Sequence, residues 1–272
     1  MEVTCPSEYT EILIAELAEA GFGMFMETDA GFEADAEEDS ADLTAVESIR
    51  NKYAHVSPLT ITTSSVPKQN WNEEWEKHVE PVIVDDQCLI RAEFHQIQKK
   101  YPYEIIITPK MSFGTGHHQT THLMIKSQMT LDHRNKLVMD AGCGTAVLSI
   151  MASKLGASNV EAFDIDEWSI LNGQENAALN GCSNIRIRQG AIADFDWPNP
   201  FDVILANINK NILLTEMAIY AKNLKPGGKL LLSGFYVKDI PDLSARAKAC
   251  GLDTISHAER EDWAALTLVR SV

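Results

Sequence analysis

The stretch Leu137-Val-Met-Asp-Ala-Gly-Cys-Gly-Thr145 decides the fold of this chain. It has the composition of a buried strand that ends in a carboxylate and breaks into a glycine turn, and a helical pattern follows over 147–155. A second apolar run ends in Asp164, 20 residues after Gly144. Strand, glycine turn, helix, strand and acid form the unit with which Rossmann-type proteins bind adenosine-containing cofactors, the acid accepting hydrogen bonds from the ribose.

The glycine turn also bears on which cofactor is bound. Val147 stands where a dinucleotide-binding fingerprint has its third glycine, which disfavours a dehydrogenase. The D-x-G-C-G form, Asp140 to Gly144, instead resembles the first motif of class I S-adenosylmethionine-dependent methyltransferases. This resemblance implies S-adenosylmethionine as cofactor, with Asp140, Gly142 and Gly144 at the turn. As alternatives, Asp140 is a cap on the turn and Asp164 a solvated strand end.

Residues 1–66 have the order of elements of a small α+β domain. Strands are predicted near 2–5, 22–28, 31–36 and 59–66, and helices over 8–20 and 43–53. Ser7 and Asp42 are the predicted helix N-caps. The residues predicted to face the core are Ile12, Leu13, Leu17, Ala20, Leu43, Val46, Ile49 and Tyr53. The order βαββαβ predicts a ferredoxin-like domain.

The charge of the chain is concentrated in this first domain. Residues 1–49 contain 14 acidic residues and no Lys or Arg, whereas the rest of the chain has 25 acidic and 23 basic residues. The net charge of −16 therefore arises almost entirely near the N-terminus. Such a domain repels nucleic acid and attracts cationic partners, although an acidic surface also serves solubility.

Cysteine usage and apolar runs bear on the compartment. The five cysteines are odd in number, scattered and without a C-x-x-C pair, which predicts reduced thiols in a cytosol and no zinc site. No apolar run reaches the ~20 residues that span a bilayer, and residues 1–5 lack the features of a signal peptide. We therefore expect a cytoplasmic protein that does not enter a membrane.

The remainder of the chain predicts a linker and a larger domain. A linker helix is expected over 67–80, where Trp71 and Trp75 are four residues apart. Residues 81–272 are the expected catalytic domain, beginning with a small β region over 81–108. Strands are then predicted at 136–140, 159–164, 185–190, 201–206, 229–233, 253–257 and 264–269, alternating with helices over most of this range. This alternation is typical of a doubly wound, Rossmann-like α/β sheet.

Ligands of such sheets bind beyond the carboxyl ends of the strands, and two residues there are candidates. Asp194 follows the strand 185–190 and is a candidate acceptor for the exocyclic amine of adenine, or else a solvated loop residue. Asn207 follows the strand 201–206 and is the candidate catalytic residue, because its amide can orient an amine nucleophile or the cofactor. The alternative for Asn207 is a helix N-cap.

The segment Met111-Ser-Phe-Gly-Thr-Gly-His-His-Gln-Thr-Thr-His122 is predicted to be a loop that folds over the cofactor. Its aromatic, its glycines and its hydroxyls suit such a lid, with Phe113 and Thr115 as expected cofactor contacts. His118 and His122 have the spacing of a zinc protease motif, but Gln119 replaces the glutamate base. No metal site is predicted.

A set of motifs across the chain resembles the PrmA family of bacterial ribosomal protein methyltransferases. The matching pieces are Phe113-Gly-Thr-Gly116, His118, Thr120-Thr121, Asp140-Ala-Gly-Cys-Gly144, Lys154-Leu-Gly-Ala157, Asp164-Ile-Asp166, Glu175-Asn-Ala177, Asn180-Gly181, Ala206-Asn-Ile208, Pro226-Gly-Gly228 and Leu232-Ser-Gly234. The resemblance implies cofactor contacts at Thr121, Gly142, Asp164 and Asn207. Ala146 and Gln119 depart from the pattern, since the family usually has glycine and proline there.

The resemblance further implies a protein N-methyltransferase. Its expected substrate is the basic large-subunit ribosomal protein eleven, modified on lysine side chains or its N-terminal amine and recognised by the acidic domain over 1–66. Direct binding of nucleic acid is not expected, since Asn207-Ile-Asn-Lys210 lacks the Asn/Asp-Pro-Pro-aromatic signature of base-modifying enzymes. The alternatives are a methyltransferase for another protein or a small molecule, and a non-catalytic S-adenosylmethionine sensor.

Overall fold

A computed structural model describes residues 1–36, 40–64, 80–109 and 118–271. The chain divides into two compact units, Met1–Asn70 and Trp71–Val272. Almost all of the predicted linker helix over 67–80 lies outside the described residues, including Trp71 and Trp75. Within the described residues, no helix combines the length and apolar character that crossing a membrane requires.

The first unit has the predicted βαββαβ order. Its elements are β1 (Glu2–Thr4), α1 (Ser7–Glu19), β2 (Gly23–Thr28), β3 (Gly31–Asp35), α2 (Leu43–Lys52) and β4 (Thr60–Thr62). The strands form an antiparallel sheet in the order β2-β3-β1-β4, so the ferredoxin-like prediction is confirmed. Leu13 and Leu17 of α1 pack with Phe32 of β3 in one buried cluster, which leaves the other face of the sheet uncovered by this core.

Two details of these helices differ from the sequence prediction. Pro6, not Ser7, is the N-cap of α1, and it makes no side-chain cap, whereas Asp42 caps α2 as predicted by accepting from the amides of Thr44 and Ala45. Ile12 and Leu43 are 47% and 58% exposed instead of facing the core. Ile12 precedes the buried Leu13 by one residue, a rotation of about 100° around the helix, which turns it toward solvent.

The second unit opens with a three-stranded sheet formed by β5 (Val82–Val84), β6 (Cys88–Arg91) and β7 (Tyr103–Ile106). Asp85 and Asp86 join β5 to β6 with φ values of 46° and 55°, as a tight hairpin turn requires. Two residues of the motifs quoted above hold β7 in place. Asn180 accepts from the amide of Ile106 at 3.0 Å and donates to its carbonyl at 2.6 Å, and Asn176 accepts from the amide of Thr108 at 2.8 Å.

The main sheet of this unit has seven strands in the order β10-β9-β8-β11-β12-β14-β13. Its elements are β8 (Leu137–Ala141), α5 (Val147–Lys154), β9 (Asn159–Asp164), α6 (Glu167–Leu179), β10 (Ile185–Gln189), β11 (Phe201–Asn207), α7 (Lys210–Asn223), β12 (Leu224–Tyr236), α8 (Ile240–Ala249), β13 (Leu252–Arg260) and β14 (Trp263–Arg270). The strands from β10 to β12 pair in parallel, and β14 is antiparallel to both neighbours.

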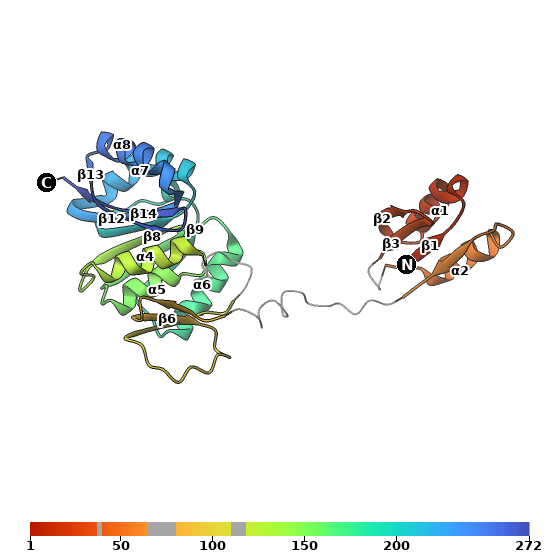
Figure 1. The fold of residues 1–272 in the computed structure, drawn as a ribbon, viewed down its shortest axis with the longest axis horizontal. Coiled ribbons are helices and arrows are strands. Elements are labelled where there is room, and N and C mark those ends of the chain that lie inside the picture. The colour runs from red at the N-terminus through yellow and green to blue at the C-terminus, as the bar shows by residue number, and fades with distance from the viewer. Residues whose placement is uncertain (37–39, 65–79, 110–117, 272) are drawn as a thin grey trace. The chain divides into compact units, whose positions relative to one another are not determined.

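Helices cover both faces of this sheet, which confirms the doubly wound prediction (Figure 1). The core on one face includes Leu213 of α7 and Leu243 of α8, and the core on the other includes Ile150 of α5. The strand order reverses at β8, between β9 and β11, and in open α/β sheets such a switch point is where ligands bind.

The prediction that residues up to His122 form a loop is wrong, because a helix, α4 (Gln119–Met129), begins at Gln119. Its N-cap is His118, whose ring accepts a hydrogen bond from the amide of Thr120. Thr120, Thr121 and His122 are buried in its first turn, and α4 packs against β12, β13 and β14. The polar Gln-Thr-Thr-His sequence has a low intrinsic helix propensity, so the sequence alone does not predict a helix here. The helix is recognised only in the structure, where this turn is buried.

Candidate cofactor and acceptor site

The glycine turn after β8 is tied to the neighbouring strand. Gly142 and Gly144 have φ values of 69° and 50°, a left-handed conformation that favours glycine. The amides of Gly142 and Cys143 both donate to the carbonyl of Phe163 in β9, at 2.9 and 3.0 Å. The turn therefore has a fixed position relative to the end of β9.

Asp164 closes the turn from the tip of β9. Its Oδ2 accepts a hydrogen bond from the amide of Gly144 at 2.9 Å, and its Oδ1 accepts from the amide of Asp166 at 3.1 Å. The side chain is half-buried at the edge of a cavity, so it is neither a free strand end nor fully enclosed. Its carboxylate keeps lone pairs for a ligand hydroxyl.

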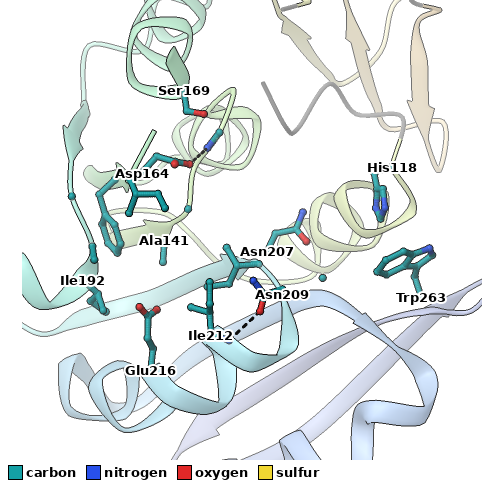
Figure 2. Close-up of a pocket in the computed structure, with 18 residues that line it drawn as sticks. His118, Ala141, Asp164, Ser169, Ile192, Asn207, Asn209, Ile212, Glu216 and Trp263 are labelled. Atoms are coloured by element: carbon teal, nitrogen blue, oxygen red, sulfur yellow. Dashed lines mark hydrogen bonds between the residues drawn. The ribbon is translucent and has the colours of Figure 1, made fainter. Parts of the chain in front are cut away.

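A cavity of about 460 Å³ lies along the carboxyl ends of β8, β9 and β11 (Figure 2). This volume is in the range of small-molecule sites. Asp164 and Ile192 stand at one end in Figure 2, and Asn207, His118 and Trp263 stand toward the other. The cavity is therefore long enough to join a ribose-binding carboxylate to a second polar region.

The backbone that leaves β11 is held between two glycines. A Cβ on Gly142 would meet Cγ2 of Ile208 at 2.5 Å, and a Cβ on Gly234 would meet the carbonyl oxygen of Ile208 at 2.2 Å. The amide of Ile208 also donates to the carbonyl of Ser233 at 3.1 Å. Glycine at both places thus allows Ile208, and Asn207 before it, to lie close to the turn.

Asn207 is the final residue of β11 and lines the cavity with only 8% of its surface exposed. Its Oδ1 is buried and has no hydrogen-bond partner within the described residues. The alternative role of helix N-cap belongs to Asn209, which accepts from the amides of Asn211 and Ile212 at the start of α7. A buried amide oxygen without a partner costs free energy unless a ligand donates to it.

Asp140 is one of the predicted cofactor residues, but it does not line the cavity. It is fully buried at the end of β8, and its Oδ2 accepts a hydrogen bond from the hydroxyl of Ser149 in α5 at 2.6 Å. Burial raises the pKa of Asp140 to about 7, against the lowering effect of the Ser149 hydrogen bond. Its contacts tie β8 to α5 beneath the turn.

The other predicted cofactor residues are placed less directly. Thr121 is buried in α4, where its Oγ1 has no partner among the described residues, and it does not line the cavity. Asp194 is exposed, accepts from the amide of Ala191 at 2.7 Å and also does not line the cavity. Phe113 and Thr115 lie outside the described residues.

Two residues that line the cavity, Trp263 and Glu216, were not predicted from the sequence. Trp263, at the start of β14, packs against the ring of His118 with centroids 4.5 Å apart and against Tyr236 at 4.3 Å. Glu216 of α7 lines the cavity below Ile192 and Ile212 in Figure 2. No sequence motif marks these side chains, since sheet closure and helix packing bring them to the site from distant segments.

The strand order, the glycine turn and the carboxylate at the β9 tip define a Rossmann-like methyltransferase fold. A profile of the ribosomal protein L11 methyltransferase (PrmA) family matches residues 13–271. The chain belongs to this family.

Individual relatives support the assignment along nearly the whole chain. The ribosomal protein L11 methyltransferase of Porphyromonas gingivalis is 43% identical over 97% of this chain and 92% of its own length. The enzyme of the same name from Bacteroides fragilis is 39% identical over 97% and 95%. The crystal structure of a ribosomal protein L11 methylase from Lactobacillus delbrueckii subsp. bulgaricus matches with a TM-score of 0.66 and 28% identity, over 71% of this chain and all of that one.

Proposed function

We propose that this protein transfers methyl groups from S-adenosylmethionine to amino groups of ribosomal protein L11. The observation that carries the proposal is a single cavity with a carboxylate and a glycine turn at one end and Asn207 at the other, whose amide oxygen has no partner among the described residues. The two ends supply acceptors for a ribose and for an amine. The proposed compartment is the cytoplasm, where ribosomal proteins are made.

The residues present fit the cofactor. Gly142 and Gly144 line the cavity beside Asp164, so a ligand there can contact the backbone of the turn. We assign Asp164 to the ribose hydroxyls and the turn at Gly142 and Gly144 to the methionine part. When bound, S-adenosylmethionine supplies a methyl group already activated by its sulfonium centre. The protein therefore has to position the partners and exclude water.

We assign Asn207 to the incoming amine. Asn207 lines the cavity, and its side-chain amide can accept a hydrogen bond from an amine N–H, which orients the nitrogen lone pair. Trp263 and His118 line the cavity on the same side of Figure 2. Burial lowers the pKa of His118, so its ring is neutral at neutral pH and adds no positive charge that would repel an amine.

The amine has to be neutral before it can react. A free lysine has a pKa of about 10.4 and an α-amine one of about 7.7–8.0. An apolar environment lowers the pKa of a lysine, because it disfavours the charged form. The aromatic wall of Trp263 and His118 provides such an environment beside Asn207. An α-amine needs less of this effect than a lysine side chain does.

We propose that the first unit recognises the basic substrate through the exposed face of its sheet. Glu2 and Glu33 are directly opposite each other on β1 and β3, and Met26 of β2 and Thr62 of β4 continue the same row. Like charges facing each other across two strands repel, and a cationic partner relieves that repulsion. Ribosomal proteins are rich in such cationic segments.

The test is to incubate the protein with labelled S-adenosylmethionine and ribosomal proteins from a strain that lacks the enzyme. We expect label in a single band, that of L11, mapped by mass spectrometry to amino groups. Label in a different protein would overturn the substrate assignment. Saturable binding of S-adenosylhomocysteine without labelling of any ribosomal protein would favour a cofactor sensor.

A further inference from the structure

The sequence makes Asp194 a candidate acceptor for the amino group of adenine, but in the structure that carboxylate has another partner. Oδ2 of Asp194 accepts the amide of Ala191 at 2.7 Å, which fixes the turn after β10, and the side chain does not line the cavity. The cavity nevertheless continues past Asp164 between apolar walls formed by Ile192 and Ile212. An apolar region beside the carboxylate that we assign to the ribose suits a purine base.

One anionic side chain stands at the end of this apolar region. Glu216, on the second turn of α7, lines the cavity and in Figure 2 points its carboxylate toward the cavity, beside Ile192 and Ile212. Its Oε2 accepts a hydrogen bond from the hydroxyl of Tyr220, one helical turn further on. Tyr220 is completely buried, so the bond fixes the glutamate rotamer. Within the described residues, Oε1 of Glu216 has no hydrogen-bond partner.

We propose that Glu216 recognises the base of the cofactor by accepting a hydrogen bond from the amino group of adenine. The inference rests on the proposed binding of S-adenosylmethionine and adds the residue that distinguishes its base. A carboxylate oxygen can only accept, so it favours the amino group of adenine and opposes the keto oxygen of hypoxanthine. Tyr220 holds the acceptor in place, which makes it a positioning residue.

The test compares two ligands by titration calorimetry, with no turnover involved. One is S-adenosylhomocysteine, and the other is its deaminated analogue, S-inosylhomocysteine, which carries a keto oxygen in place of the amino group. For the wild type we expect the affinity for S-adenosylhomocysteine to exceed that for S-inosylhomocysteine by at least about tenfold. This ratio corresponds to the free energy of one hydrogen bond to a charged acceptor. Glu216→Gln, which keeps the shape and can still bond to Tyr220, should lose most of that preference.

Two further variants make the result specific. Asp194→Asn should keep the wild-type preference, because its carboxylate lies outside the cavity. Tyr220→Phe should weaken the preference less than Glu216→Gln does, because the carboxylate remains. Melting temperatures show that each variant is folded.

The outcomes distinguish a failure of the Glu216 assignment from a failure of the proposed cofactor site. If the wild type does not bind S-adenosylhomocysteine, the proposed cofactor site itself fails. If the wild type binds it but Glu216→Gln keeps the full base preference, or Asp194→Asn abolishes it, the role of Glu216 is overturned and the cofactor site stands.

Discussion

The amide of Gly144 donates to Oδ2 of Asp164 at 2.9 Å, which joins the turn after β8 to the tip of β9. The same carboxylate is thus both a brace for the backbone and an edge of the cavity. Bracing and the proposed ligand binding share one side chain, so a substitution there should affect both.

Replacing Asp164 should therefore weaken cofactor binding and folding together. For Asp164→Ala we expect affinity for S-adenosylhomocysteine to fall by at least about tenfold and stability to fall by about 1–2 kcal/mol, because the Gly144 amide loses its acceptor. Titration calorimetry and urea denaturation measure the two effects. Asp166→Asn is the control. Asp166 caps α6 by accepting a hydrogen bond from the amide of Ser169, and Asn is an equally good N-cap residue. Unchanged affinity in Asp164→Ala would remove Asp164 from the site.

Asn207 and Asn209 are two residues apart, but replacing them should have different effects: one on turnover and the other on stability. Asn207→Ala should lower turnover strongly with little change in stability, because its Oδ1 has no partner among the described residues to lose. Asn209→Ala should lower stability by about 1 kcal/mol through loss of the α7 cap, with a smaller effect on turnover. Single-turnover rates and thermal melts test the pair. Wild-type rates in Asn207→Ala would exclude it from the mechanism.

Asp140 predicts an unusual pH dependence of stability. Its pKa is raised to about 7 by burial, so between its unfolded value of about 3.9 and about 7 the folded protein holds a proton that the unfolded chain has lost. Stability from this group is complete below that unfolded value and declines as the pH rises through about 7. Asp140→Asn cannot titrate, so its stability should decline less than that of the wild type over this interval. Urea midpoints across the range test this, and parallel curves for the two proteins would contradict it.

Charge on the exposed sheet face of the first unit should affect substrate binding. In Glu2→Gln/Glu33→Gln, KM for the ribosomal protein should rise and become less dependent on salt, while kcat stays close to wild type. Stability should rise slightly, by up to about 1 kcal/mol, because the two carboxylates no longer face each other. Asp132→Asn/Glu93→Gln, a double variant at two exposed positions of the second unit, is the charge-matched control. Equal KM shifts in both variants would mean that net charge, and not this face, matters.

Ala146 departs from the glycine that the family usually has, and the structure shows the consequence. Its φ is 61°, in the left-handed region, and its side chain is fully buried at the start of α5. A Cβ on Gly173 of α6 would be 3.3 Å from the Cβ of Ala146. Ala146→Val should therefore destabilise the protein by about 2 kcal/mol or more, since a branched residue is strained there and has no room. Ala146→Gly should be close to neutral, and chemical denaturation of both variants measures the contrast.

Much of the fold was predictable because its signals are local. The glycine turn, the cap at Asp42 and the hairpin at Asp85 and Asp86 each depend on a few neighbouring residues. The parallel strands were recognisable as short apolar runs, and their alternation with helices predicted a doubly wound sheet, whereas the order of the strands in the sheet came from the structure. The helix α4 was missed because its first turn is polar and its burial comes from contacts with remote strands.

The residues of the candidate site likewise fall into those that the sequence predicts and those that only the structure shows. By itself the sequence determined that Asp164, Gly142 and Asn207 stand at strand ends, because the end of each strand is marked within the segment that forms it. Only the tertiary structure decided that Trp263 and Glu216 join them, that Asp140 lies beneath the site and that Asn209 caps α7 in place of Asn207. Local conformation is fixed by interactions between near neighbours in sequence, whereas these placements depend on how distant segments pack against each other, which no short stretch of sequence records.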